Sequence, residues 1–117
     1  MIEKLDRSSG NVIGYHFSSV IDKSDYEVLV PEMESLVKEH GTVRMLCDLT
    51  DFKWEKFSAW PSDARFGHEF KNKITRMAII GDGVGQKIIA VFADKFYCPD
   101  SARYFEDEDA AWAWLSE

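Results

Sequence analysis

The seven residues "VRMLCDL" at positions 43–49 decide the fold class, because they form an almost unbroken apolar run. A strand with apolar side chains on both faces is typical of the centre of a largely parallel sheet that is covered by helices on both sides. A second run of the same character, "ITRMAIIG" at 74–81, follows further along the chain. The two runs are therefore predicted to be neighbouring central strands.

The segments around these two strands alternate between strand and helix patterns. "IEKL" and "NVIGYHFS" are predicted to form an N-terminal hairpin, since the Ser, Gly and Asn residues between them favour a turn. The full set of predicted strands is 2–5, 11–18, 43–49, 74–81 and 102–105, and the predicted helices are 24–41, 61–71, 84–97 and 106–117. This order predicts an α/β fold: a mixed, largely parallel sheet of four or five strands flanked by about four helices.

The first helix has clear terminal signals. Ser24 followed three residues later by Glu27 matches a capping box, which marks a helix start. Gly41 stands where a left-handed residue commonly ends a helix. Pro31 lies inside the apolar periodicity, so we expect the helix to continue past it with a kink.

The overall composition fits one soluble domain over residues 1–117. Hydrophobic residues make up 45% and charged residues 30%, and no apolar run is long enough to span a membrane. The net charge of −7 argues against a nucleic-acid surface, which needs clustered positive charge. The start of the chain lacks the apolar region of a signal peptide.

The spacing of the cysteines, histidines and glycines predicts a chain without a metal or cofactor. Cys47 and Cys98 are the two cysteines, and they are not spaced as a CxxC motif. Without a signal peptide they suggest a reducing cytoplasm, with Cys47 as a small core residue. The three histidines form no ligand pattern, and the glycines of "GDGVGQK" at 81–87 do not match GxGxxG or a Walker motif.

Polar residues near the third strand offer a weak catalytic pattern. Asp48 and Asp51 stand at the predicted strand end and in the loop after it, where aspartates commonly cap turns. His16 falls on the face of its strand opposite Ile13, Tyr15 and Phe17, and we expect it to be a partly covered structural histidine. No nucleophile–base–orienter set accompanies them, so the sequence predicts no enzyme activity.

Several stretches together resemble the SpoIIAA-like family, a group of small bacterial proteins related to STAS domains, the anti-sigma-factor antagonists. These stretches are the hairpin, "PEMESLVKEHGTVRMLCDLTDF", "FGHEF", "RMAIIGD" and "RYFEDEDAAWAWL", which cover nearly the whole chain. The family is often compared with lipid-binding CRAL-TRIO domains. The resemblance implies a four- or five-stranded sheet flanked by helices and no established enzyme activity.

The phosphorylation switch of the antagonists does not carry over to this chain. Asp48, Leu49 and Thr50 match the Asp-Leu-Ser-like turn of those proteins. The following Asp-Ser-Ser-Gly-like segment is replaced by "EKFSAW", which holds Ser58 alone. We therefore expect Ser58 not to be a regulatory phosphosite.

Aromatic residues are concentrated between 52 and 70. Some of them exceed what one helix on a sheet needs, which indicates either an interface or ligand groove or a simple wrapping of the core. Phe70 is expected to be core and Trp54 to be surface. The candidate binding residues are Phe52, Trp54, Phe57, Trp60, Phe66, Ile88 and Phe92.

Two functions follow from this segment. The first is a non-enzymatic protein-interaction or regulatory module, which would bind a second copy of itself or another protein through 52–70 and the helix predicted at 84–97. The alternative is a carrier or sensor of an apolar small molecule, such as a fatty acid, held between those helices.

Overall fold

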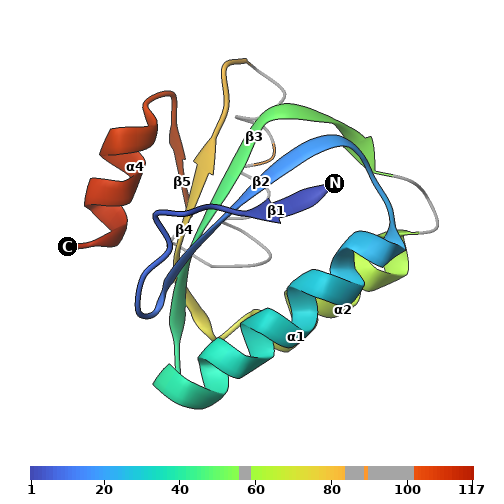
Figure 1. The fold of residues 1–117 in the computed structure, drawn as a ribbon, viewed down its shortest axis with the longest axis horizontal. Helices are drawn as coiled ribbons and strands as arrows, with labels where there is room; N and C mark the ends of the chain where they lie inside the picture. Colours follow the sequence, from blue (N-terminus) through green and yellow to red (C-terminus); the bar gives the residue numbers. More distant parts are fainter. Residues whose placement is uncertain (56–58, 84–88, 90–101) are drawn as a thin grey trace.

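The computed structural model describes residues 1–55, 59–83, 89 and 102–117, apart from the side chains of 54, 55 and 60, and contains a five-stranded sheet (Figure 1). The strands lie side by side in chain order; the first pair is antiparallel and the others are parallel. Their bounds are β1 Ile2–Lys4, β2 Val12–Ile21, β3 Val43–Glu55, β4 Ile74–Ile80 and β5 Ala102–Phe105. The predicted hairpin is confirmed, and so are the neighbouring positions of the two apolar runs.

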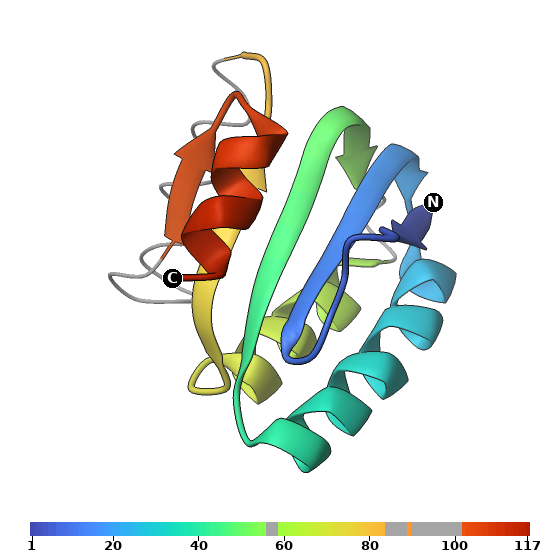
Figure 2. The same cartoon turned by 60° about the vertical axis from the view of Figure 1, so that its left-hand side comes forward.

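The described helices cover both faces of the sheet. Helices α1 (Lys23–His40) and α2 (Trp60–Phe70) lie on one face, and α4 (Glu108–Leu115) lies on the other (Figures 1 and 2). Of the helix predicted at 84–97, the structure describes Ile89, which packs against the core. The rest of that helix lies outside the described residues. No helix in the described ranges is long and apolar enough to cross a membrane.

The sheet divides the core into two layers. Along β3, Met45 and Cys47 belong to the larger layer under α1 and α2, whereas Leu46 belongs to the smaller layer under α4. Successive side chains of a strand point to opposite faces, so a strand buried on both sides must be apolar at nearly every position. This requirement explains the run "VRMLCDL".

Helix α1 begins earlier than the capping signal predicted. Asp22, not Ser24, is its N-cap: the Asp22 side chain accepts a hydrogen bond from the Ser24 backbone N–H at 2.9 Å. Asp25 completes the capping box by accepting from the Asp22 N–H at 2.9 Å. The helix continues past Pro31 and ends before Gly41, whose φ of 84° is in the left-handed region.

Strand β3 is longer than predicted. It was expected to end at Leu49, but it continues to Glu55, so the first part of the aromatic segment is strand and not loop. The extension pairs with β2 through two register shifts, which interrupt the alternation that a sequence pattern can reveal. The error therefore comes from the irregular pairing.

Candidate functional site

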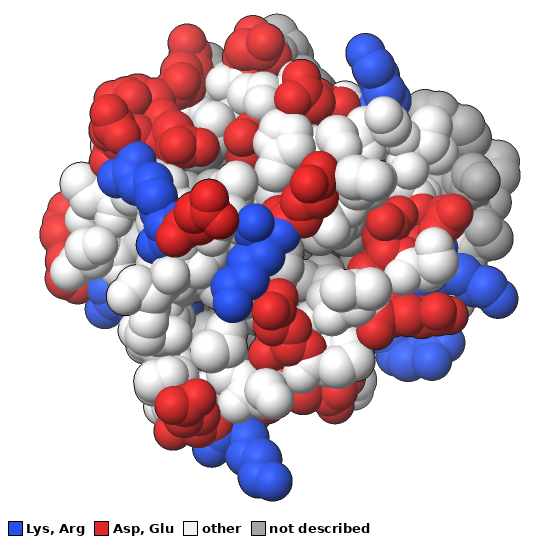
Figure 3. All heavy atoms as spheres, in the orientation of Figure 1, with Lys and Arg blue, Asp and Glu red and all other residues white. Residues whose placement is uncertain are grey.

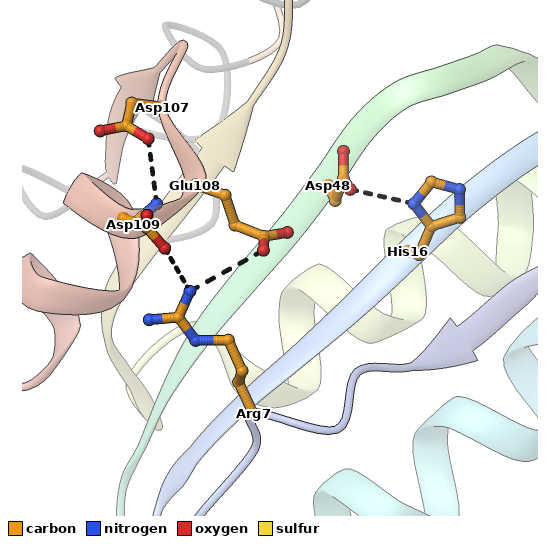
Figure 4. A network of polar contacts seen from close by, with 6 residues as sticks. All are labelled: Arg7, His16, Asp48, Asp107, Glu108 and Asp109. Carbon is orange, nitrogen blue, oxygen red and sulfur yellow. Dashed lines mark hydrogen bonds and ion pairs between the residues drawn. The ribbon is translucent and has the colours of Figure 1, made fainter.

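One histidine and two aspartates meet on the sheet face that carries α4. His16 lies on β2, and Asp48 and Asp51 lie on β3. His16 Nδ1 is 3.0 Å from Asp48 Oδ2, and His16 Nε2 is 2.9 Å from Asp51 Oδ2. Figure 4 shows the imidazole beside Asp48, on strands that run next to each other. Each ring nitrogen therefore faces a carboxylate.

A β-bulge in β3 brings the two aspartates to the same side. Asp48 pairs with His16 and Asp51 pairs with Ser18, so β3 advances by three residues while β2 advances by two. In a regular strand, residues three apart point to opposite faces, and the extra residue of a bulge cancels that difference. Asp48 Oδ1 stabilises the bulge by accepting hydrogen bonds from the Thr50 N–H at 3.1 Å and the Thr50 hydroxyl at 2.7 Å.

The pKa values of His16 and Asp48 shift in the direction that keeps both groups charged. The hydrogen bond to Asp48 raises the pKa of His16 above 6.5, against the opposing effect of burial, and the charges of Asp48 and Asp51 add to the rise. Burial alone would raise the pKa of Asp48, but hydrogen bonds from Thr50 and His16 outweigh it, so the pKa lies below 3.8. The two carboxylates thus favour the protonated form of the imidazole that lies between them.

The geometry of the cluster suits holding two strands together better than catalysis or metal binding. While the imidazole is protonated, both nitrogens of His16 donate to carboxylates, and neither has a lone pair available to accept a substrate proton. The two carboxylates lie at opposite nitrogens of the ring and do not converge on one point. Within the described ranges, no group of three or more His, Cys, Asp or Glu side chains could hold a metal ion.

A second group of charged side chains lies on the α4 side of the sheet, apart from the cluster. Arg7, from the loop between β1 and β2, pairs with Asp109 at 2.6 Å and with Glu108 at 3.9 Å (Figure 4). Asp107 caps α4 by accepting from the Asp109 N–H. Figure 3 shows acidic side chains gathered over the start of this helix.

The structure places the predicted aromatic site residues in different environments. Phe66 is 5% exposed, and its ring centroid lies 6.3 Å from that of Tyr26 and 4.9 Å from that of Phe70. Phe66 is therefore buried beneath α1, and its assignment to the predicted groove or interface stays a prediction. Phe52 is half-buried against the larger core layer.

For the remaining predicted site residues, either the side chain or the whole residue lies outside the described part of the chain. For Trp54 and Trp60 the structure describes the backbone, in β3 and at the start of α2. Wholly outside the described residues are Phe57, Ser58, Ile88 and Phe92.

Cys47 and Phe70 lie in the core, as predicted from the sequence. Cys47 is 6% exposed, and burial raises the pKa of its thiol to about 12, so the thiolate needed for reactivity is suppressed. Phe70 is 2% exposed. Neither residue belongs to the candidate site.

Sequence reasoning missed the contact between His16 and the two aspartates. It placed each residue near a strand, but their meeting depends on strand register and on the bulge. One local signal was present: an Asp followed two residues later by Thr is a pattern in which the carboxylate bonds the following backbone. That signal predicts a turn or bulge at Asp48, although not its partner.

Comparisons with known proteins agree with this fold. A solved structure of an uncharacterized protein of the DUF3478 family, with a SpoIIAA-like fold, from Shewanella loihica PV-4, superposes with a TM-score of 0.82. The two sequences are 26% identical, and the match covers 98% of this chain and 92% of the Shewanella chain. No curated protein matches the chain. The family model described as SpoIIAA-like matches residues 12–116. The chain therefore belongs to the SpoIIAA-like family.

Proposed function

We propose that this chain is a non-enzymatic module that binds another protein, in the first place a second copy of itself. The SpoIIAA-like fold suggests a regulatory or interaction module in general. We assign the binding surface to the aromatic segment 52–70, without Phe66, together with the segment predicted as helix 84–97.

Support for this surface comes from the position of the end of β3. Within the described residues, β3 pairs with β2 as far as Glu55 but with β4 only as far as Asp48. The aromatic segment therefore begins at the rim of the sheet, where Phe52 is half-buried and not enclosed by the core. Apolar side chains at such a rim are the kind that an interface covers.

Support for a non-enzymatic role comes from His16. Its two nitrogens are occupied by Asp48 and Asp51, so the cluster satisfies its own charges. A general base needs a nitrogen within reach of the proton that it removes. With the imidazole protonated, the arrangement contributes to holding the strands and leaves no acceptor for chemistry.

Native mass spectrometry and sedimentation test the proposal. We expect a doubled native mass for the wild-type chain and a monomer for Trp54→Ala. Val28→Ala is the matched control, because Val28 is an apolar side chain, 70% exposed, on α1 and outside the segment 52–70. It should leave association unchanged. A monomeric wild type without any bound mass would overturn the proposal.

Ionic strength separates this association from contacts between charged groups. Two copies with a net charge of −7 each repel one another, and salt screens that repulsion. Association through apolar side chains should therefore strengthen as salt is added. A co-purified small molecule that is released on denaturation would instead favour the alternative, a carrier of an apolar ligand.

We further infer that the protein works in the reducing cytoplasm. Cys47 is a free, buried thiol, which is usual for proteins that do not meet oxidising conditions. Fractionation of cells that produce the protein would test this inference, and recovery from an oxidising compartment would refute it.

A further inference from the structure

We propose that His16 is a pH-operated latch for the last residues of β3, Asp51–Glu55. The latch holds them against β2 while the imidazole is protonated and releases them when it is neutral. It is a property of the isolated chain and stands whether or not the chain binds the partner proposed above.

The latch follows from the number of protons on the ring. An imidazolium carries two N–H groups, and the two nitrogens face carboxylate oxygens at 3.0 and 2.9 Å. Neutral imidazole carries one N–H. The nitrogen that loses its proton then presents a lone pair to a carboxylate, and two acceptors repel each other at this distance. One of the two contacts must therefore break.

The contact to Asp51 is the one that breaks. The Asp48 side chain is 13% exposed, and Thr50 holds its other oxygen with two hydrogen bonds. The Asp51 side chain is 68% exposed and can turn into water at little cost. The remaining proton thus stays on Nδ1 with Asp48, and Nε2 and Asp51 separate.

The charged groups near the ring influence whether His16 is protonated. On β1, Glu3 is the cross-strand partner of His16, and on β3 the neighbours are Asp48 and Asp51. On the α4 side, Arg7 is already paired with Glu108 and Asp109 (Figure 4). Helices α1 and α2 lie on the opposite face of the sheet. The environment of His16 is therefore predominantly acidic and favours the engaged state.

The end of β3 depends on this link because its pairing is irregular. A second register shift lies between Ser19 and Val20, and Ser19 has a φ of 58°, in the left-handed region that non-glycine residues rarely adopt. Bulges interrupt the ladder of backbone hydrogen bonds. A side-chain link beside two bulges therefore contributes a large share of what fixes Asp51–Glu55.

Three chains that differ at Asp51 test the latch by hydrogen exchange. The exchange of amides 51–55 is measured at a series of pH values across the titration of His16. It is expressed as a protection factor, because the intrinsic exchange rate of an amide itself depends on pH. In the wild type we expect protection to fall, by up to about fivefold, as His16 loses its proton, because water screens partly exposed pairs. Asp51→Ala should show the low value at every pH.

Asp51→Asn gives the sharpest result. Its amide can accept a hydrogen bond from Nε2–H or donate one to the bare nitrogen, so it fits both states of the ring. Protection should therefore stay high and independent of pH. The residue is mostly exposed, so both variants are expected to fold.

Two readouts decide the outcome. Ring NMR signals of His16 report its protonation, and the exchange of amides 51–55 reports the state of the strand end. If the wild-type ring titrates while protection at 51–55 stays constant, the latch is wrong. A pH-dependent fall in Asp51→Asn as large as in the wild type would overturn it as well.

Discussion

The indole of Trp112 on α4 lies directly against Gly14 on β2. A Cβ atom on Gly14 would come within 2.6 Å of Trp112 Cη2, 2.8 Å of Cζ2 and 3.2 Å of Leu5 Cδ1. Trp112 is only 5% exposed, so its ring has little room to move away. The absence of a side chain at position 14 is what lets the helix approach the sheet.

Gly14→Ala is therefore expected to destabilise the fold by about 1–3 kcal/mol, the usual cost of an extra methyl group in a filled core. Urea unfolding followed by circular dichroism measures the loss. The double variant with Trp112→Phe should recover part of it, because a smaller ring leaves space for the methyl. Strict additivity of the two changes would show that the ring is not the obstacle.

Phe70→Ala and Trp54→Ala should have different effects. Phe70 is 2% exposed and packs on Phe66, so its truncation should cost about 3–5 kcal/mol of unfolding free energy. Trp54→Ala should cost much less stability and should weaken association. Thermal unfolding and sedimentation of both variants measure the two effects. Equal destabilisation with unchanged association would place Trp54 in the core.

Two arginines hold the end of α4. Arg44 Nη1 donates to the carbonyls of Leu115 at 2.7 Å and Glu117 at 2.6 Å, and Arg76 Nη1 donates to that of Trp114 at 2.6 Å. Cations at a helix C-terminus also interact favourably with the helix dipole.

Arg44→Ala is thus expected to cost about 1.5–3 kcal/mol, the usual range for hydrogen bonds to a charged group, and to loosen α4. Hydrogen exchange of residues 108–115 checks the second effect. Arg65→Ala, an exposed position on α2, is the control and should leave α4 protected. Unchanged exchange in Arg44→Ala would contradict the role of the arginine.

Stability should also depend on pH through the cluster at His16. The folded-state pKa of His16 is raised above 6.5, so its contribution is complete below that pH and is lost as pH rises through the raised value. The pKa of Asp48 is lowered below 3.8, so its contribution is present above that pH and is lost as pH falls.

We expect the alkaline loss to be less than about 1 kcal/mol, because water screens partly exposed pairs. Urea unfolding at a series of pH values measures it, and His16→Gln should remove the alkaline dependence. If the unfolding free energy of His16→Gln falls with rising pH as it does in the wild type, other groups cause the alkaline loss.

The regular parts of this fold were predictable because burial imposes a pattern on the sequence. The runs 43–49 and 74–81 are apolar on both faces, as neighbours covered by helices must be. The start of α1 was misplaced because Asp22 and Ser24 are both good caps, and their local sequences do not decide between them. The extension of β3 was missed because its bulges break the alternation of side chains.

The candidate site depends on information that is not local. The alternation along β2 correctly put His16 on the face opposite Tyr15, but the register against β3 decides that it meets Asp48 and Asp51. Phe66 was predicted to line an apolar groove or interface because it shares an apolar helix face with Phe70. Nothing nearby in the sequence indicates that Tyr26, on another helix, covers it.

The shortness of β1 has a consequence for aggregation. It spans Ile2–Lys4, and two of its residues, Glu3 and Lys4, are charged. At the opposite side of the described sheet, β5 spans only Ala102–Phe105 and includes exposed Arg103. Short, charged edge strands are poor templates for the addition of further strands. The two edges therefore protect the chain against open-ended growth into fibrils.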